Sequence, residues 1–170
     1  QEIGALLHRR LDASKTFAAV TRGLNAAPGA AAGKVVFDIA EAVTLSQKNE
    51  SVILVRPDTS PDDILGISAA AGVLTARGGL TSHAAIVTRA MGKPCVCGAS
   101  EVEIDLKGQQ FTVNGHVVKK GDEITIDGST GAVYLGSLPL IDAEVHGALD
   151  ELMTWASEYK RLGVMANADT

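Results

Sequence analysis

The order of secondary-structure signals along the chain is the feature that most constrains its fold. Between residues 34 and 97, short apolar runs typical of buried strands alternate with segments that begin with helix-start signals. From residue 101 to residue 135 there are no helix signals, and short strand-like runs are separated by turn sequences such as Asn114-Gly115. Strand–helix alternation followed by hairpins predicts a mixed α/β domain with more than one layer of sheet.

Local patterns place the individual elements. We expect strands over residues 34–37, 52–55, 73–76, 95–97, 110–113, 116–119, 123–126 and 132–135, and helices over residues 39–48, 61–68 and 81–91. The second of these helices has Ser60 as its N-cap and Pro61 at its first position, where the missing N–H would be unpaired in any case. Residues 25–33 are nearly all Ala, Gly and Pro, so we expect a turn there.

Both ends of the chain show helical patterns. Near the N-terminus, apolar residues from Ile3 to Leu11 recur at roughly helical spacing, which predicts a helix. Near the C-terminus, residues 141–162 are predicted to form a longer helix, followed by a strand-like run. We therefore expect a helical linker over residues 1–24, a central domain over 25–137, and a second helical linker with the start of a further domain over 138–170. This arrangement predicts a piece of a larger polypeptide. The alternative is a complete small protein with frayed ends.

Composition argues against several classes of function. The net charge of −5, from 15 basic and 20 acidic residues, argues against a nucleic-acid-binding surface. No apolar run reaches the roughly 18 residues of a membrane-spanning helix, so a membrane protein is not expected. The two cysteines, Cys95 and Cys97, are too few for a disulfide framework and fit a reducing compartment.

Two short motifs are incomplete versions of known binding sites. Between Gly29 and Gly33 there are three residues and Val35 follows Lys34, whereas a phosphate-binding P-loop has four residues there and a Ser or Thr after the lysine. The Cys-x-Cys pair at the end of the alternating region lacks the second ligand pair of a zinc site. Because alternate residues of a strand point to one side, we expect two buried thiols there rather than a metal site.

Residues 77–87 combine several features of a reactive site. A strand leads into two glycines, and a helix follows at once, with Thr81 as its expected N-cap. The backbone N–H groups and the dipole at a helix N-terminus favour an anion, and glycines let the backbone approach a phosphate. His83 lies in the first turn, where its imidazole could act as a nucleophile and a phosphoryl group on it would be stabilised. The candidate supporting residues beside it are Gly78, Gly79, Thr81 and Ser82.

The residues alone leave two interpretations of His83 open. In the first, His83 is a nucleophile that takes up a phosphoryl group. In the second, it only caps its neighbourhood and does no covalent chemistry. The other three histidines, His8, His116 and His146, are scattered along the chain, and we expect His116, next to a hairpin turn, to face solvent.

The segment around His83 resembles the phosphohistidine, or swivelling, domain of phosphoenolpyruvate-utilising enzymes. Gly78-Gly79-x-Thr81-Ser82-His83-Ala84-Ala85 is similar to the signature of that domain, in which the histidine carries the phosphoryl group. Further segments resemble the dikinases of this family, namely residues 25–33, 53–56, 59–63, 92–93, 95–96, 127–131 and 166–170. Pro94 stands where those dikinases commonly have cysteine, and it is similar to the pattern of the related phosphoenolpyruvate synthases and the phosphotransferase-system enzyme.

This resemblance implies a fold, a reaction and neighbouring domains. The fold is a layered β/β/α swivelling domain flanked by helical linkers. The whole enzyme would interconvert ATP, phosphate and pyruvate with AMP, pyrophosphate and phosphoenolpyruvate, and His83 would shuttle the phosphoryl group between two remote active centres. The linkers over residues 1–24 and 138–170 would join this domain to a nucleotide-binding ATP-grasp domain and to a phosphoenolpyruvate/pyruvate barrel that starts near Val164.

The resemblance also implies cofactors, assembly and location. Mg²⁺ and a monovalent cation would serve the full enzyme at sites outside this chain, and the chain itself would hold no metal. The parent enzyme would be an intracellular homo-oligomer, in the cytoplasm or in an organelle such as a plastid or glycosome. Within the family, the alternative is a phosphoenolpyruvate synthase or a phosphotransferase-system enzyme. The alternative of a different class is a non-catalytic connector module.

Four residues near His83 have open supporting roles. Thr81 and Ser82 either hydrogen-bond phosphoryl oxygens or cap the helix. In plant members of the family, the threonine two residues before the histidine is a regulatory phosphorylation site, and Thr81 matches that position. A phosphate on Thr81 would repel an incoming phosphoryl group. Arg77 and Arg89 either offset phosphate charge or, in the case of Arg89, lie on the helix surface.

Overall fold

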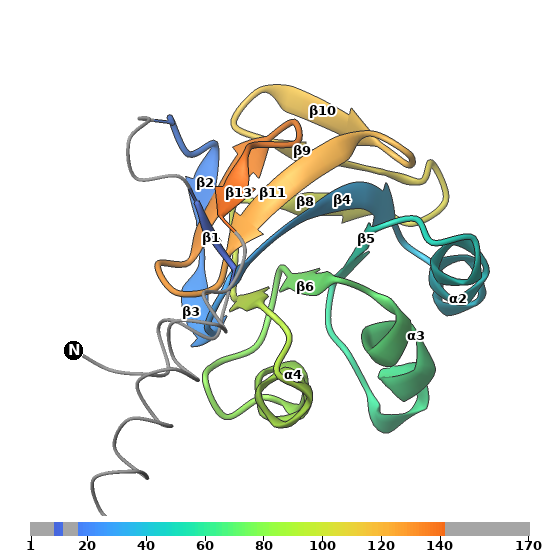
Figure 1. The fold of residues 1–170 in the computed structure, drawn as a ribbon. Coiled ribbons are helices and arrows are strands. Elements are labelled where there is room, and N and C mark those ends of the chain that lie inside the picture. Colours follow the sequence, from blue (N-terminus) through green and yellow to red (C-terminus); the bar gives the residue numbers. More distant parts are fainter. Residues whose placement is uncertain (1–8, 12–16, 142–170) are drawn as a thin grey trace, which may run out of the picture. The chain divides into compact units, whose positions relative to one another are not determined.

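An eight-stranded mixed sheet organises the chain, for which the computed structural model describes residues 9–11 and 17–141 (Figure 1). Its strands, in their order across the sheet, are β2 Thr21–Arg22, β12 Ala132–Leu135, β11 Glu123–Asp127, β4 Ala30–Val36, β5 Val52–Arg56, β6 Gly72–Thr75, β7 Cys95–Cys97 and β3 Leu24–Ala27. The central strands β4 to β7 pair in parallel, and the outer pairings are antiparallel. The alternating part of the sequence therefore forms the parallel part of the sheet, as expected of strands joined by helices.

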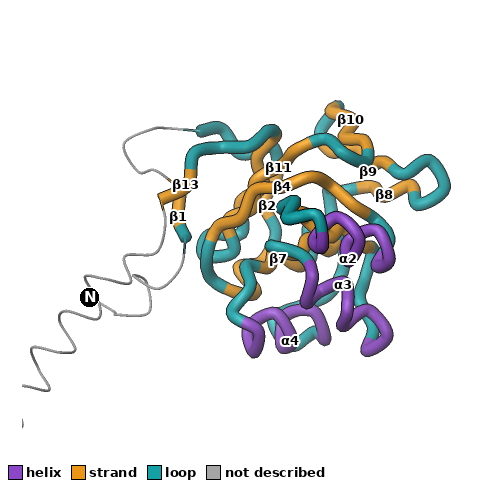
Figure 2. Tube along the Cα trace, turned by 45° about the vertical axis from the view of Figure 1, so that its right-hand side comes forward, coloured by secondary structure: helices purple, strands orange, loops and turns teal. Residues whose placement is uncertain are grey.

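A small sheet and the helices cover opposite faces of the large sheet. The small antiparallel sheet has the order β10 His116–Lys119, β9 Gln110–Val113 and β8 Glu103–Asp105. The helices are α2 Ile39–Gln47, α3 Ile64–Ala69 and α4 His83–Met91, with a 3₁₀ turn, η1 Pro61–Asp63, before α3. Figure 2 shows the helices gathered on one side of the strands. The expected mixed α/β class with β/β/α layers is confirmed. None of the helices in the described residues is long and apolar enough to cross a bilayer.

Alternate residues of the central strands point into two separate hydrophobic clusters. Ile53 belongs to the cluster that includes Phe111 of the small sheet. Its neighbour Leu54 belongs to the cluster that includes Ile67 of α3. All four side chains of residues 52–55 are fully buried, each at 0% exposure. Because both faces of this strand are covered, its sequence is apolar at every position rather than at alternate ones.

Within residues 34–135 the expected strands and helices are present with shifted ends, and β8 is a strand there that the sequence does not predict. The entry to the second helix is confirmed. Ser60 is the N-cap, Pro61 occupies the first position, and the Asp63 carboxylate accepts a hydrogen bond from the Ser60 N–H at 2.9 Å. This reciprocal pairing satisfies a backbone donor that the helix itself leaves without a partner.

Helix α4 begins two residues later than expected. Ser82 is its N-cap, with an extended backbone (φ −65°, ψ 162°) and a side chain that accepts a hydrogen bond from the Ala85 N–H at 3.4 Å. Thr81 is exposed and lies in the preceding turn, where the Ser82 N–H donates to the Gly79 carbonyl at 3.0 Å. The prediction of Thr81 as N-cap is wrong because Thr and Ser are both good caps, and the path of the loop selects between them. His83 is therefore the first residue of α4.

The expected turn over residues 25–33 is also wrong. These residues form β3 and β4, and only Pro28 and Gly29 lie between the two strands. Small side chains allow the strands to pack here, since a Cβ on Gly33 would lie 2.6 Å from the Ser51 carbonyl oxygen. The incomplete P-loop is thus a segment of sheet whose small residues permit close approach of neighbouring backbone.

The ends of the described chain differ from the expected helical linkers. Arg9–Ile141 forms one compact unit, which is wider than the expected central domain over 25–137. The prediction of a helical linker over residues 1–24 is wrong at two places. Arg10–Leu11 forms β1, which pairs with β13 Leu140–Ile141, and residues 21–22 form β2 at one edge of the large sheet. The remaining linker predictions concern residues 1–8, 12–16 and 142–170, including His8, His146 and Val164, and lie outside the described residues.

The assignment of the α4 cap predicts unequal effects of two neighbouring substitutions. Ser82→Ala removes the oxygen that accepts from the Ala85 N–H, so the free energy of unfolding should fall by about 1 kcal/mol. Thr81→Ala, the matched control, should change it by no more than about 0.5 kcal/mol because Thr81 is exposed outside the helix. Urea denaturation of the two variants measures both values. A larger loss for Thr81→Ala than for Ser82→Ala would contradict the assignment.

Gly128 is predicted to be required for the contact between β3 and the β11–β12 turn. A Cβ at this position would lie 1.8 Å from the Ala27 carbonyl oxygen and 2.9 Å from the Cys95 nitrogen, which are backbone atoms. Gly128→Ala should therefore lower the free energy of unfolding by about 1–3 kcal/mol or more. Gly79→Ala is the control, since a Cβ there meets nothing within 4 Å. Equal melting temperatures for the two variants would show that the close approach is wrong.

Candidate functional site

The candidate residues gather in the loop that joins β6 to α4. This loop begins at the carboxyl end of β6, which pairs in parallel with β5 and with β7. The crevice outside the carboxyl ends of parallel strands is where α/β proteins bind ligands. Residues 76–82 of this loop and His83 at the start of α4 therefore lie at an edge of the sheet where a ligand could be reached.

Gly78 sets the path of this loop. Its φ of +101° lies in the left-handed region, which favours glycine, and a Cβ there would lie in tight contact, 3.1 Å from the Ser82 Cβ. Just before it, the Arg77 carbonyl accepts hydrogen bonds from Thr75 Oγ1 at 2.6 Å and from the Gly98 N–H at 3.4 Å. The loop thus leaves the sheet in a fixed direction.

Gly79 serves a different purpose from Gly78. A Cβ at Gly79 would meet no other atom within 4 Å, so the space around this residue is open. This openness fits the expectation that a ligand approaches the backbone here. Gly78 therefore makes the turn, and Gly79 leaves the backbone beside it accessible.

His83 is half-buried at the first position of α4, and one of its ring nitrogens lacks a partner. Its Nε2 atom is buried and makes no hydrogen bond within the described chain. A buried polar atom without a partner costs free energy, and such costs are retained at functional sites. Because helical Cα–Cβ bonds tilt towards the N-terminus, a side chain in the first turn is expected to project past the helix end. With Nε2 turned inward instead, a reaction at this nitrogen requires the imidazole to turn.

Ser82 connects the start of α4 to the two cysteines of β7. Its Oγ lies 3.7 Å from Cys97 Sγ, which in turn lies 3.4 Å from Cys95 Sγ. Both thiols are buried on the same side of β7, which confirms the expectation drawn from their spacing. The hydrogen bond with Cys95 and the contact with Ser82 lower the pKa of Cys97, whereas the hydrogen bond to Cys97 and burial raise the pKa of Cys95. Cys97 is therefore the first of the pair to lose its proton.

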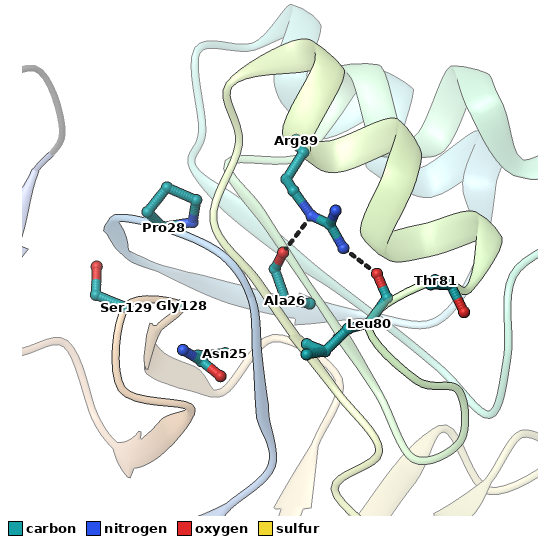
Figure 3. A pocket seen from close by; sticks show the side chains of 8 residues that line it. All are labelled: Asn25, Ala26, Pro28, Leu80, Thr81, Arg89, Gly128 and Ser129. Atoms are coloured by element: carbon teal, nitrogen blue, oxygen red, sulfur yellow. Dashed lines mark hydrogen bonds between the residues drawn. The ribbon is translucent and has the colours of Figure 1, made fainter. Parts of the chain in front are cut away.

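The supporting residues separate into capping, exposed and bridging groups. Ser82 is a cap, as its contacts show, while Thr81 has no capping role and its exposed side chain is accessible to other molecules. Arg77 is exposed at the start of the loop. Arg89 is not a simple surface residue of α4, because its Nε donates to the Ala26 carbonyl at 2.7 Å and its Nη2 donates to the Leu80 carbonyl (Figure 3).

A hollow of about 510 Å³ lies beside this bridge. Figure 3 shows Thr81 and Arg89 at one part of its wall, with Asn25 and Ser129 at another. Its lining residues are Asn25, Ala26, Pro28, Leu80, Thr81, Arg89, Gly128 and Ser129. The loop that leads to His83 therefore forms one wall of an open depression between α4 and the strand ends of the large sheet.

Two features of this site were missed by sequence reasoning. The first is the contact between Ser82 and Cys97. The alternation of side chains along a strand places Cys97 on one face of β7, but it does not indicate that the start of α4 lies on that face. The bridge made by Arg89 joins residues that lie 63 and 9 positions away, and no local pattern indicates it. Among the described residues, no group of three His, Cys, Asp or Glu side chains could hold a metal ion.

Comparisons with known proteins place this chain in a family. Residues 48–131 match the family described as "PEP-utilising enzyme, mobile domain". The chain is 49% identical to a pyruvate, phosphate dikinase of Rickettsia felis over 100% of its own length and 19% of that protein. The dikinase of Entamoeba histolytica is 46% identical over 99% of this chain and 19% of that protein, and the dikinase of Clostridium symbiosum is 45% identical over 100% and 20%.

These relatives are much longer than this chain, which spans about one fifth of their length. A solution structure of Enzyme I is 28% identical and aligns with 67% of this chain and 41% of its own, at a TM-score of 0.39 that is too low to bear on the fold. The sequence match is independent of that alignment and extends along the whole chain. Residues 48–131 therefore belong to the mobile-domain family of phosphoenolpyruvate-utilising enzymes, and the chain is similar throughout its length to the pyruvate, phosphate dikinases.

Proposed function

We propose that this chain is the phosphoryl-carrier domain of a pyruvate, phosphate dikinase and that His83 carries the phosphoryl group. The observation that supports this most strongly is the placement of His83. It is the first residue of α4, it follows a loop that Gly78 turns and Gly79 leaves open, and its Nε2 is unpartnered. The similarity of the whole chain to dikinases agrees with this role.

The chemistry needs a neutral imidazole that has turned its Nε2 out of the protein, and an environment that stabilises an anion. In the forward step the lone pair of the ring nitrogen forms a bond to phosphorus, and the bond from phosphorus to the donor oxygen breaks, with the electron pair leaving on that oxygen. The new phosphoryl group would lie near the first backbone N–H groups of α4 and the positive end of its dipole. The reverse step transfers the group to an acceptor oxygen and restores the imidazole.

The remaining parts of the reaction belong to other domains in this proposal. Residues 1–24 and 138–170 would connect the carrier to an ATP-grasp domain and to a phosphoenolpyruvate/pyruvate barrel, so that it swivels between two centres. Mg²⁺ and a monovalent cation would act in those domains, and the parent enzyme would be a homo-oligomer inside the cell. Together the domains would convert ATP, phosphate and pyruvate to AMP, pyrophosphate and phosphoenolpyruvate.

One residue favours a second candidate, a phosphoenolpyruvate synthase. Pro94 precedes β7 at the position where the dikinases commonly have cysteine, and its carbonyl accepts a hydrogen bond from the Val73 N–H at 3.1 Å. The two candidates differ in their use of pyrophosphate. In the dikinase, transfer of label from the phosphorylated polypeptide to AMP should require added pyrophosphate. Transfer that occurs with added inorganic phosphate in place of pyrophosphate would exclude the dikinase assignment and favour the synthase.

The role of His83 predicts a covalent label that depends on this residue alone. The complete polypeptide that contains this chain is incubated with phosphoenolpyruvate labelled in its phosphoryl group. The protein should gain a label that is stable in alkali and lost in acid, and His83→Asn should abolish it. His116→Asn, which changes an exposed histidine of β10, should label like the unchanged protein. Full labelling of His83→Asn would show that His83 is not the carrier.

A further inference from the structure

We propose that Arg89 is a positioning residue for His83, an inference that rests on the proposed carrier function. Arg89 lies in the last turn of α4, two turns after His83, and does not belong to the loop that enters the helix. Its guanidinium nevertheless reaches back along the helix and donates a hydrogen bond to the Leu80 carbonyl within that loop (Figure 3). The side chain can do this because helical Cα–Cβ bonds tilt towards the N-terminus.

The second partner of Arg89 is a carbonyl that an irregularity in β3 sets free. Strand β3 pairs with β7 through Asn25↔Val96 and Ala27↔Cys95, and the register shifts between Asn25 and Ala27. Ala26 is the residue at this bulge, so its carbonyl is not part of a regular ladder pair. The Nε of Arg89 donates to that carbonyl at 2.7 Å. The bulge therefore supplies a fixed point on the sheet to which Arg89 is attached.

The hydrogen bond from Arg89 holds a carbonyl of the loop that the loop's other hydrogen bonds, within the described chain, do not hold. The Arg77 carbonyl is held by Thr75 Oγ1 and by the Gly98 N–H, and the Gly79 carbonyl is held by the Ser82 N–H. Leu80 lies inside the turn from Gly79 to Ser82, and the residue is 46% exposed. Among the hydrogen bonds within the described residues, the one from Arg89 is the one that holds the Leu80 carbonyl.

A guanidinium is suited to this task because its donors form a rigid planar fork. One edge of the fork reaches the sheet at Ala26, and the other reaches the loop at Leu80. The bridge thus fixes the loop relative to the sheet three residues before His83. A lysine at position 89 has a single ammonium group and can reproduce this geometry only in part. The function of Arg89 is therefore to orient the start of α4, without touching the reacting atoms.

A residue just beyond the C-terminal end of the same helix provides a matched control. Lys93 follows α4, and its Nζ donates hydrogen bonds to the carbonyls of Ser68 and Ala70 at the end of α3. Lys93→Gln removes a cation that binds two carbonyls, as Arg89→Gln does, but the carbonyls it releases are not in the loop before His83. A comparison of the two variants therefore separates the orientation of the loop from the general attachment of α4.

The test measures the labelling of the complete polypeptide by phosphoenolpyruvate over a range of concentrations, for wild type, Arg89→Gln, Arg89→Lys and Lys93→Gln. Arg89→Gln should lower the maximal labelling rate roughly 10–100-fold, as expected when a reacting group is misplaced by a fraction of an ångström to an ångström. The half-saturating concentration should stay within about twofold, because Arg89 does not contact the donor. Arg89→Lys should recover part of the rate. Lys93→Gln should label within about twofold of wild type.

Three results would overturn the inference. They are a wild-type maximal rate in Arg89→Gln, an equal loss of rate in Lys93→Gln, and a raised half-saturating concentration at an unchanged maximal rate. The melting temperature of each variant shows whether it is folded at the assay temperature. If Arg89→Gln is not folded there, the labelling rate of Arg89→Lys is compared with wild type instead. If wild type itself takes up no label, the proposed carrier function fails. If wild type is labelled on His83 and Arg89→Gln matches it, only the role of Arg89 fails.

Discussion

Burial of the central parallel strands on both faces is the constraint on which the rest of the structure depends. Successive residues of β5 point in turn to the small sheet and to the helices, and all of residues 52–55 are fully buried. A shift of one residue in register would exchange the two hydrophobic sets, so the register is strongly fixed. Because the register is fixed, the carboxyl ends of these strands have fixed positions relative to one another. The loop from β6 to α4 begins at this edge of the sheet.

The candidate site uses that edge as a support and adds its own attachments. Gly78 turns the chain, Ser82 caps α4, and Arg89 ties the loop to the bulge of β3. None of these contacts is an ion pair, yet together they determine where the first residue of the helix lies. The overall charge of −5 is compatible with phosphate handling, because the positive field at this site comes from a helix end rather than from an excess of basic residues.

Much of the fold was predictable because its signals are local. The apolar runs, the cap at Ser60 and the turn at Asn114-Gly115 are each decided by a few adjacent residues, and the structure has them in place. Residues 25–33 were mistaken for a turn because Ala and Gly have weak strand preferences. They form strands where neighbouring backbone comes too close for larger side chains, as at Gly33. Sequence-based expectations reflect the average behaviour of such residues and carry no information about that distance.

The sequence by itself determined the layered α/β class and identified His83 as the candidate nucleophile, since the fold class and the candidate site both follow from residue types at short, regular spacings. Only the tertiary structure decided that Ser82 rather than Thr81 caps α4, that His83 Nε2 is turned inward, and that Arg89 bridges β3 and the loop. Each of these depends on which backbone atoms the folded chain brings within hydrogen-bonding distance. Ala26 and Arg89 are 63 positions apart, and only the packing of α4 on the edge of the sheet makes them neighbours.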